Sequence, residues 1–180
     1  MDRPGLPSFA RNSGFTLLEL MVVLGLTLAL ATLAQPSLRG LLLRWALEAE
    51  AQTLLDDLRY ARTQALVRAQ AVSICPTADG LACAGHGEWG RGWMIFLDAE
   101  ANRVPGAGKL VLRQHQPSAS VQAITSNASA LRAGLTYQPT GAARAAGQSL
   151  RLVAGSALRL VCISMQGRAA LRPEGQTQCS

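Results

Sequence analysis

Four cysteines are the residues of this sequence whose spacing most directly suggests shared chemistry. They fall into two neighbouring pairs, Cys75 with Cys83 and Cys162 with Cys179, and each pair would close a short loop. Four cysteines allow three connectivities, of which the pairing of neighbours is the most economical. The apolar N-terminal segment described below indicates an exported chain, and in that setting an even cysteine count favours disulfides. We therefore predict disulfides within the two pairs.

A metal site is the alternative chemistry for the first cysteine pair. Cys75, Cys83 and His86 could act as ligands, but a structural zinc ion needs four ligands at tight spacing. The other imidazole belongs to His115, and nothing in the sequence forces it close. His86 stands between two glycines, which is typical of a solvent-exposed loop. We expect disulfides here, with neither a metal nor a cofactor.

The acidic residues beyond residue 70 do not form a catalytic set. They lie in expected loops: Asp79, Glu88, Asp98, Glu100 and Glu174. The segment 98–102 has some features of a calcium loop but lacks the central glycine and terminal glutamate of an EF-hand, so we interpret it as a turn. No phosphate-binding glycine loop occurs. Trp89 and Trp93 could form a binding platform but are more typical of a core. The sequence predicts a protein that is not an enzyme.

Basic residues outnumber acidic ones and give the chain a formal net charge of +6. Arg159, Arg168 and Arg172 could gather at one end of a sheet, together with Lys109 or Arg113. Such a cluster would suit an anionic partner such as DNA. A dispersed arginine surface is the favoured interpretation, so DNA is a possible partner that we do not favour.

A run of twenty mainly apolar residues, 15–34, follows a short polar and slightly basic N-terminus. Its length matches the hydrocarbon core of a bilayer, and the arginines before it favour a cytoplasmic N-terminus. Three interpretations compete: a plain membrane anchor, a signal peptide cut after Ala31, and a short leader cut between Gly14 and Phe15. Glu19 favours the third, because an ionisable group inside a membrane run is costly and usually functional.

The segment Gly14-Phe15-Thr16-Leu17-Leu18-Glu19 resembles the signature of type IV pilins and pseudopilins. The resemblance implies that a prepilin peptidase cuts between Gly14 and Phe15 and that Phe15 is then N-methylated. It also implies that Glu19 pairs with the N-terminal amine of a neighbouring subunit. Such pairing would satisfy two charges in an apolar filament core and fix the stagger of the subunits.

The residues after the apolar run indicate a second, amphipathic half of one long helix. Pro36 predicts a kink, because proline removes a helical hydrogen bond, and pilin-family helices commonly carry a proline here. Apolar residues then recur three and four positions apart. These are Leu47, Ala51, Leu54, Leu58, Ala61, Ala65 and Ala69. We expect a leader at 1–14, a membrane half-helix at 15–35 and an amphipathic half-helix at 36–70.

Short β-like runs separated by glycine, proline and aspartate fill residues 71–180, with no second helix expected. The expected strands are 72–75, 92–97, 108–116, 120–125, 135–137, 149–154 and 157–164. Close spacing of this kind predicts an antiparallel sheet or sandwich. The fold class is therefore α+β: a long N-terminal helix packed on an antiparallel β-domain.

A second block of residues is similar to the GspH/FimT branch of minor pseudopilins and pilins. It comprises Ser73-Ile74-Cys75-Pro76, then Cys83, then the run from Glu88 to Asp98, with Gly167-Arg168 near the C-terminus. FimT members involved in DNA uptake carry a Gly-Arg-x-Arg motif at that last place. Here Arg172 stands two positions too late for the motif, although Arg168 and Arg172 keep the same parity along a strand.

The sequence therefore predicts a minor pilin or pseudopilin subunit, anchored by a single pass in the inner membrane with its globular domain in the periplasm. Its expected partners are other pilin-like subunits, the prepilin peptidase and the inner membrane. The filament could be a type II secretion pseudopilus or a type IV pilus. The alternatives left open are a DNA-binding minor pilin for transformation and a soluble periplasmic protein with an ordinary signal peptide.

Overall fold

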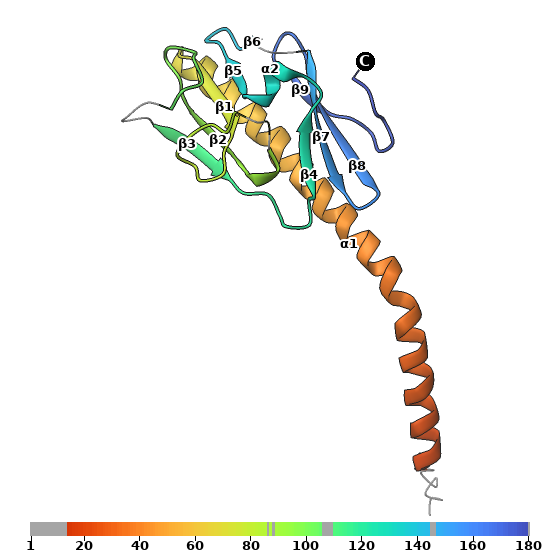
Figure 1. Ribbon diagram of the computed structural model, residues 1–180. Helices are drawn as coiled ribbons and strands as arrows, with labels where there is room; N and C mark the ends of the chain where they lie inside the picture. The colour runs from red at the N-terminus through yellow and green to blue at the C-terminus, as the bar shows by residue number, and fades with distance from the viewer. Residues whose placement is uncertain (1–13, 86, 88, 106–109, 145–146, 180) are drawn as a thin grey trace, which may run out of the picture. The chain divides into compact units, whose positions relative to one another are not determined.

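The computed structural model of the chain describes residues 14–85, 87, 89–105, 110–144 and 147–179, without the side chains of 31–37 and 129–130. The chain divides into two compact units, Met1–Arg39 and Gly40–Ser180. One helix and nine strands, with two very short helical turns, are assigned in the described part (Figure 1). The α+β class predicted from the sequence is confirmed.

Helix α1, Leu17–Arg68, includes 52 residues and covers both of the expected half-helices. Its N-terminus is capped by Thr16, whose side-chain oxygen accepts a hydrogen bond from the Glu19 backbone N–H at 3.2 Å. Thr-x-x-Glu is a common helix start for this reason. The helix continues through position 36, and because the Pro36 side chain is not described, the kink stays a prediction. Among the described residues, no helix has the length and apolarity needed to cross a membrane.

The predicted apolar face of the amphipathic half is confirmed from Leu47 to Ala65, where all six positions are buried. The prediction is wrong at Ala69, which is exposed. Helix α1 ends at Arg68, and Ala69 has a φ of 50° in the left-handed region. The Ala69 and Gln70 N–H groups bond back to the Leu66 and Ala65 carbonyls, so the chain turns here into the first strand.

Two antiparallel sheets make up the β-domain. The first has the strand order β3-β2-β1-β5-β6. Its strands are β1 Val72–Pro76, β2 Trp93–Leu97, β3 Val111–His115, β5 Leu135–Tyr137 and β6 Ala143–Arg144. The second has the order β4-β7-β8-β9. Its strands are β4 Ala123–Ser126, β7 Gln148–Ala154, β8 Ala157–Ile163 and β9 Ala169–Leu171. All pairings are antiparallel, as predicted.

All seven expected strands are present, but some of their bounds differ and several short elements were missed. The expected strand at 120–125 begins only at Ala123, because the Val121 N–H bonds to the Ser118 carbonyl and closes a turn. The missed elements are the short helices η1 (Trp89–Arg91) and α2 (Ser129–Arg132) and the strands β6 and β9. They have two to four residues each and are too short for a periodic pattern.

The main core lies where the apolar face of α1 meets both sheets. Its members include Leu54 and Leu58 of α1, Ile74 and Ile95 of the first sheet, and Leu150 of the second. Trp89 and Trp93 are fully buried, as expected for core residues. Figure 1 shows the C-terminal half of α1 alongside strands of both sheets. The amphipathic half-helix is therefore a structural part of the β-domain.

A smaller core covers the other face of the first sheet. Because side chains alternate along a strand, Met94 and Phe96 point away from Ile95, and they pack with Cys75 and Cys83. Both predicted disulfides are present, Cys75–Cys83 with a sequence separation of 8 and Cys162–Cys179 with a separation of 17. The first disulfide thus closes the loop that covers this second core.

Candidate functional site

The expected cleavage site lies just before the start of α1. Gly14, Phe15 and Thr16 precede the helix, and the Phe15 ring is 85% exposed. The helix begins directly after Thr16, whose hydroxyl caps it. The Gly14–Phe15 peptide is thus in exposed, non-helical chain, the form in which a peptidase can bind a substrate backbone.

Glu19 lies in the first turn of α1, where its negative charge is favoured by the helix dipole. Its side chain is exposed among large apolar residues such as Leu18 and Leu20, and no ion-pair partner occurs among the described residues. In an apolar environment an unpaired carboxylate would cost several kcal/mol. In such surroundings Glu19 would require a partner beyond the part of the chain that the structure describes.

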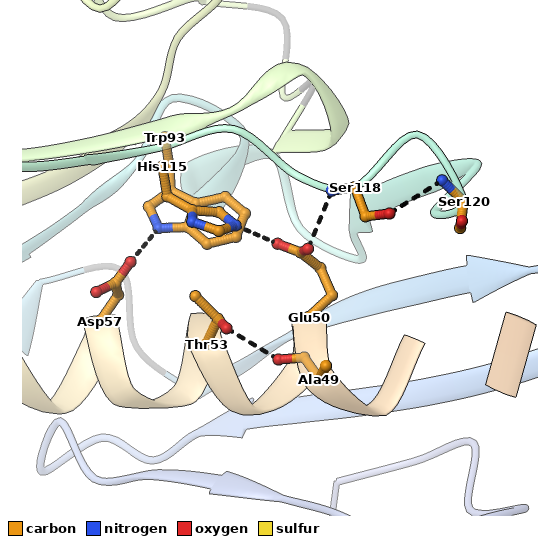
Figure 2. Close-up of polar contacts among 8 residues, drawn as sticks. All are labelled: Ala49, Glu50, Thr53, Asp57, Trp93, His115, Ser118 and Ser120. Carbon is orange, nitrogen blue, oxygen red and sulfur yellow. Dashed lines mark hydrogen bonds and ion pairs between the residues drawn. The ribbon is translucent and has the colours of Figure 1, made fainter. Parts of the chain in front are cut away.

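A second polar site, which the sequence did not predict, ties α1 to strand β3. Glu50 is buried on the helix, and its two oxygens face the same strand region (Figure 2). His115 Nε2 lies 2.6 Å from Glu50 Oε1, and the Ser118 backbone N–H donates to Glu50 Oε2 at 3.1 Å. The buried carboxylate is thus satisfied by two groups from one segment of the β-domain.

Asp57 repeats this arrangement two turns further along α1. The Trp93 indole N–H donates to Asp57 Oδ2 at 2.7 Å, and Arg113 forms an ion pair with Oδ1 at 2.6 Å. His115 stacks against Trp93 with ring centroids 4.5 Å apart, so the Glu50 and Asp57 contacts adjoin (Figure 2). We call Glu50, Asp57, Trp93, Arg113 and His115 the polar seam.

The polar seam is structural in character. Each carboxylate is held by groups already in place, His115 and Ser118 for Glu50 and Trp93 and Arg113 for Asp57. The sequence does contain a signal for the polar seam. Glu50 and Asp57 are seven residues apart, and each immediately precedes a residue of the apolar face of the helix. Two acids at the same helical position beside a buried stripe indicate buried partners on the opposing sheet.

Two members of the expected arginine cluster have acidic partners on α1. Arg113 is bound to Asp57, and Arg159 forms an ion pair with Glu48 on α1. Lys109 lies outside the described residues. Arg168 and Arg172 do line one hollow of about 450 Å³ beside the Cys162–Cys179 disulfide, at the two ends of β9. The expected grouping with Arg113 and Arg159 stays a prediction, and the helix carboxylates Asp57 and Glu48 are partners of those two side chains.

The loop residues considered for chemistry have structural partners. Asp98 is buried and accepts hydrogen bonds from the Ser73 hydroxyl and from the Asn102 and Arg103 backbone N–H groups. The segment 98–102 is thus a turn, as predicted. The N–H groups of Leu81 and Ala82 lower the pKa of Asp79. Within the described ranges no three His, Cys, Asp or Glu residues are grouped as metal ligands, and His86 and Glu88 fall outside those ranges.

Comparison with known proteins places the fold and the N-terminus in one class. The chain matches a prokaryotic N-terminal methylation motif at residues 9–34. Its fold resembles crystal structures of the type IV minor pilin FimU from Pseudomonas aeruginosa in two crystal forms, with TM-scores of 0.57 and 0.55 at 24% identity. These matches cover 73% of this chain and 93% and 98% of the two FimU chains. The N-terminal helix packed on an antiparallel β-domain is therefore a pilin-like fold.

The chain belongs to the GspH family, whose description is type II transport protein GspH and which matches residues 50–167. A curated relative, the pilin-like protein PilA1 of Thermus thermophilus, is 35% identical over 162 residues, or 88% of this chain and 97% of PilA1. The family assignment made from the sequence is confirmed. The matched range begins at Glu50, the first residue of the polar seam.

The polar seam yields a stability prediction with a neighbouring control. Replacing Asp57 by Asn should lower the free energy of unfolding by about 1–2 kcal/mol, because the buried carboxylate loses its charge-assisted contacts with the Trp93 indole and with Arg113, which is itself half exposed. Asp56 is exposed and makes only a 3.7 Å ion pair with Arg59. Asp56→Asn should cost less than about 0.5 kcal/mol. Urea unfolding followed by the fluorescence of Trp89 and Trp93 measures both, and equal effects would contradict the assignment.

Proposed function

We propose that this protein is a minor pilin or pseudopilin subunit, cut between Gly14 and Phe15 and N-methylated at Phe15. It is anchored in the inner membrane by the apolar half of α1, residues 15–35, and is incorporated into a filament. Its β-domain contacts other subunits in the periplasm. Its role is structural and not enzymatic.

The observation that carries this proposal is the arrangement of residues 14–19, which include the expected cleavage site and the start of α1. An exposed Gly-Phe peptide, a Thr16 cap and the exposed Glu19 in the first turn, which has no ion-pair partner among the described residues, follow one another within a methylation motif. An ordinary signal peptide or membrane anchor has no use for the carboxylate. A filament has one, since the amine freed at Phe15 and the carboxylate of Glu19 can neutralise each other between subunits.

The proposal covers two kinds of filament. The family description refers to type II transport, whereas FimU is a type IV minor pilin. In either kind of filament we expect the N-terminal helix to pack laterally with neighbouring helices. The polar seam supports this task, because it holds the β-domain on α1 while the helix is engaged elsewhere.

A DNA-binding role is the second candidate, and a single observation favours it. Arg168 and Arg172, at the two ends of β9, line the same hollow. Against it, Arg113 and Arg159 are held by Asp57 and Glu48, so the basic cluster is smaller than the sequence allows. We therefore propose the filament role first.

The cleavage site gives a direct test. Gly14→Val should leave the precursor largely uncut, because a bulky residue before the scissile bond would not fit a pocket that accepts glycine. Gly40→Val is a matched control, since a Cβ at either glycine meets no atom within 4 Å. Intact-mass measurement of the membrane fraction reads the cut. A mature N-terminus at Thr32 would overturn the class of protein proposed here.

Glu19 gives a test of incorporation. Glu19→Leu should be processed and anchored normally but be recovered with sheared filaments at about one tenth of the wild-type level, equivalent to ~1.4 kcal/mol. Glu19→Asp keeps the charge and should retain part of the incorporation. Immunoblots of filament and membrane fractions measure the ratio. Normal incorporation of the Leu variant would contradict the proposed pairing.

The arginines separate the two candidate functions. For a filament subunit with a diffuse basic surface, DNA association should be weak and salt-sensitive, and Arg168→Gln with Arg172→Gln should change the log–log salt slope no more than Arg132→Gln with Arg151→Gln. A DNA site at β9 would instead lose about two units of slope in the first variant only. Fluorescence anisotropy of labelled duplex at several salt concentrations distinguishes these results.

A further inference from the structure

One apolar surface of the β-domain unit faces away from its core. On α1, Leu43 and Leu47 point inward and pack with the core. Leu41, Leu42 and Trp45 therefore lie on the other side of the helix, where their side chains are 42%, 52% and 62% exposed. We call Leu41, Leu42, Arg44 and Trp45 the outer patch.

The outer patch ends sharply on its C-terminal side. From Ala49 to Arg59 the exposed side of α1 carries only small or polar residues. The exposed residues there are Ala49, Gln52, Asp56 and Arg59. Trp45 also differs from the other two tryptophans, Trp89 and Trp93, which are fully buried. A large aromatic side chain left on the surface at such a boundary calls for an external contact.

The residue types of the outer patch indicate which contact this is. Helix–helix interfaces in apolar surroundings favour small residues that let backbones approach. The outer patch instead combines large aliphatic side chains with a tryptophan and an exposed arginine. Tryptophan is enriched at bilayer–water boundaries, and arginine is attracted to anionic headgroups there.

We propose that, before the subunit enters a filament, the outer patch docks on the headgroup region of an anionic bilayer, with Trp45 and Arg44 as its anchors. This inference rests on the membrane anchoring proposed above. Trp45 is eleven residues beyond Ala34, the last residue of the apolar run. A helix of that length rises about 16 Å, more than the roughly 6 Å thickness of a headgroup layer. Trp45 reaches lipid only if this part of α1 lies along the surface, so docking does not follow from anchoring alone.

Trp45 itself is the probe for a test in full-length protein. The chain is reconstituted in nanodiscs of phosphatidylcholine with or without phosphatidylglycerol, and tryptophan emission is recorded with brominated lipids and with aqueous acrylamide. Trp45→Phe supplies the background from Trp89 and Trp93. We expect Trp45 to be quenched by brominated lipid and shielded from acrylamide, more strongly in the anionic discs.

Arg44→Gln supplies the charge test, with Arg151→Gln on β7 as a control that removes the same charge from an exposed site on the second sheet. Losing Arg44 should lower the docked-to-undocked ratio about fivefold in anionic discs, as expected for one arginine at a charged surface. Arg151→Gln should leave the ratio unchanged.

The outcomes separate the two levels of inference. Protein that stays in the discs while Trp45 remains open to acrylamide would overturn the docking alone. Shielding of Trp45 that requires a second copy per disc, without quenching by brominated lipid, would overturn it too, by assigning the outer patch to a subunit contact. Protein that does not remain with the discs would overturn both the docking and the membrane anchoring.

Discussion

The interaction on which the rest of the β-domain depends is the contact between buried carboxylates of α1 and basic or indole donors of the first sheet. Burying Glu50 and Asp57 is unfavourable unless each carboxylate is satisfied. His115, Ser118, Trp93 and Arg113 do this only in one register of helix against strand. The apolar face of α1 supplies most of the buried surface, while the polar seam determines the position along the helix at which the sheet packs.

The carboxylates in the N-terminal and C-terminal halves of α1 differ in whether their partners belong to the described chain. Around Glu19 a carboxylate is left without a partner in the described chain, and the function proposed for it requires another molecule. At Asp57 a carboxylate of the same helix is fully used within the chain. One helix thus keeps its assembly contacts external and its folding contacts internal. Changes at one end should therefore leave the other intact.

The sequence predicts the helix, the principal strands, the disulfides and the family, because each has a strong local pattern. The apolar stripe has a clear period, the cysteines are near neighbours, and the Gly14–Glu19 segment is specific. It did not predict β6 and β9, which are too short to show a period. Nor did it predict that Glu48 and Asp57 hold Arg159 and Arg113, because ion pairs between distant segments depend on strand register.

The two disulfides have a consequence for mechanics. Both are local, closing segments 75–83 and 162–179, and neither joins α1 to the sheets. If a filament is stretched through its helices, the load passes to the β-domain through side-chain packing, the polar seam and the backbone that joins Arg68 to Val72. Under such a load the helix would separate from the sheets, but the two segments closed by disulfides would add no length to the extending chain. A force–extension curve would therefore report a contour shorter than the sequence by those two loops.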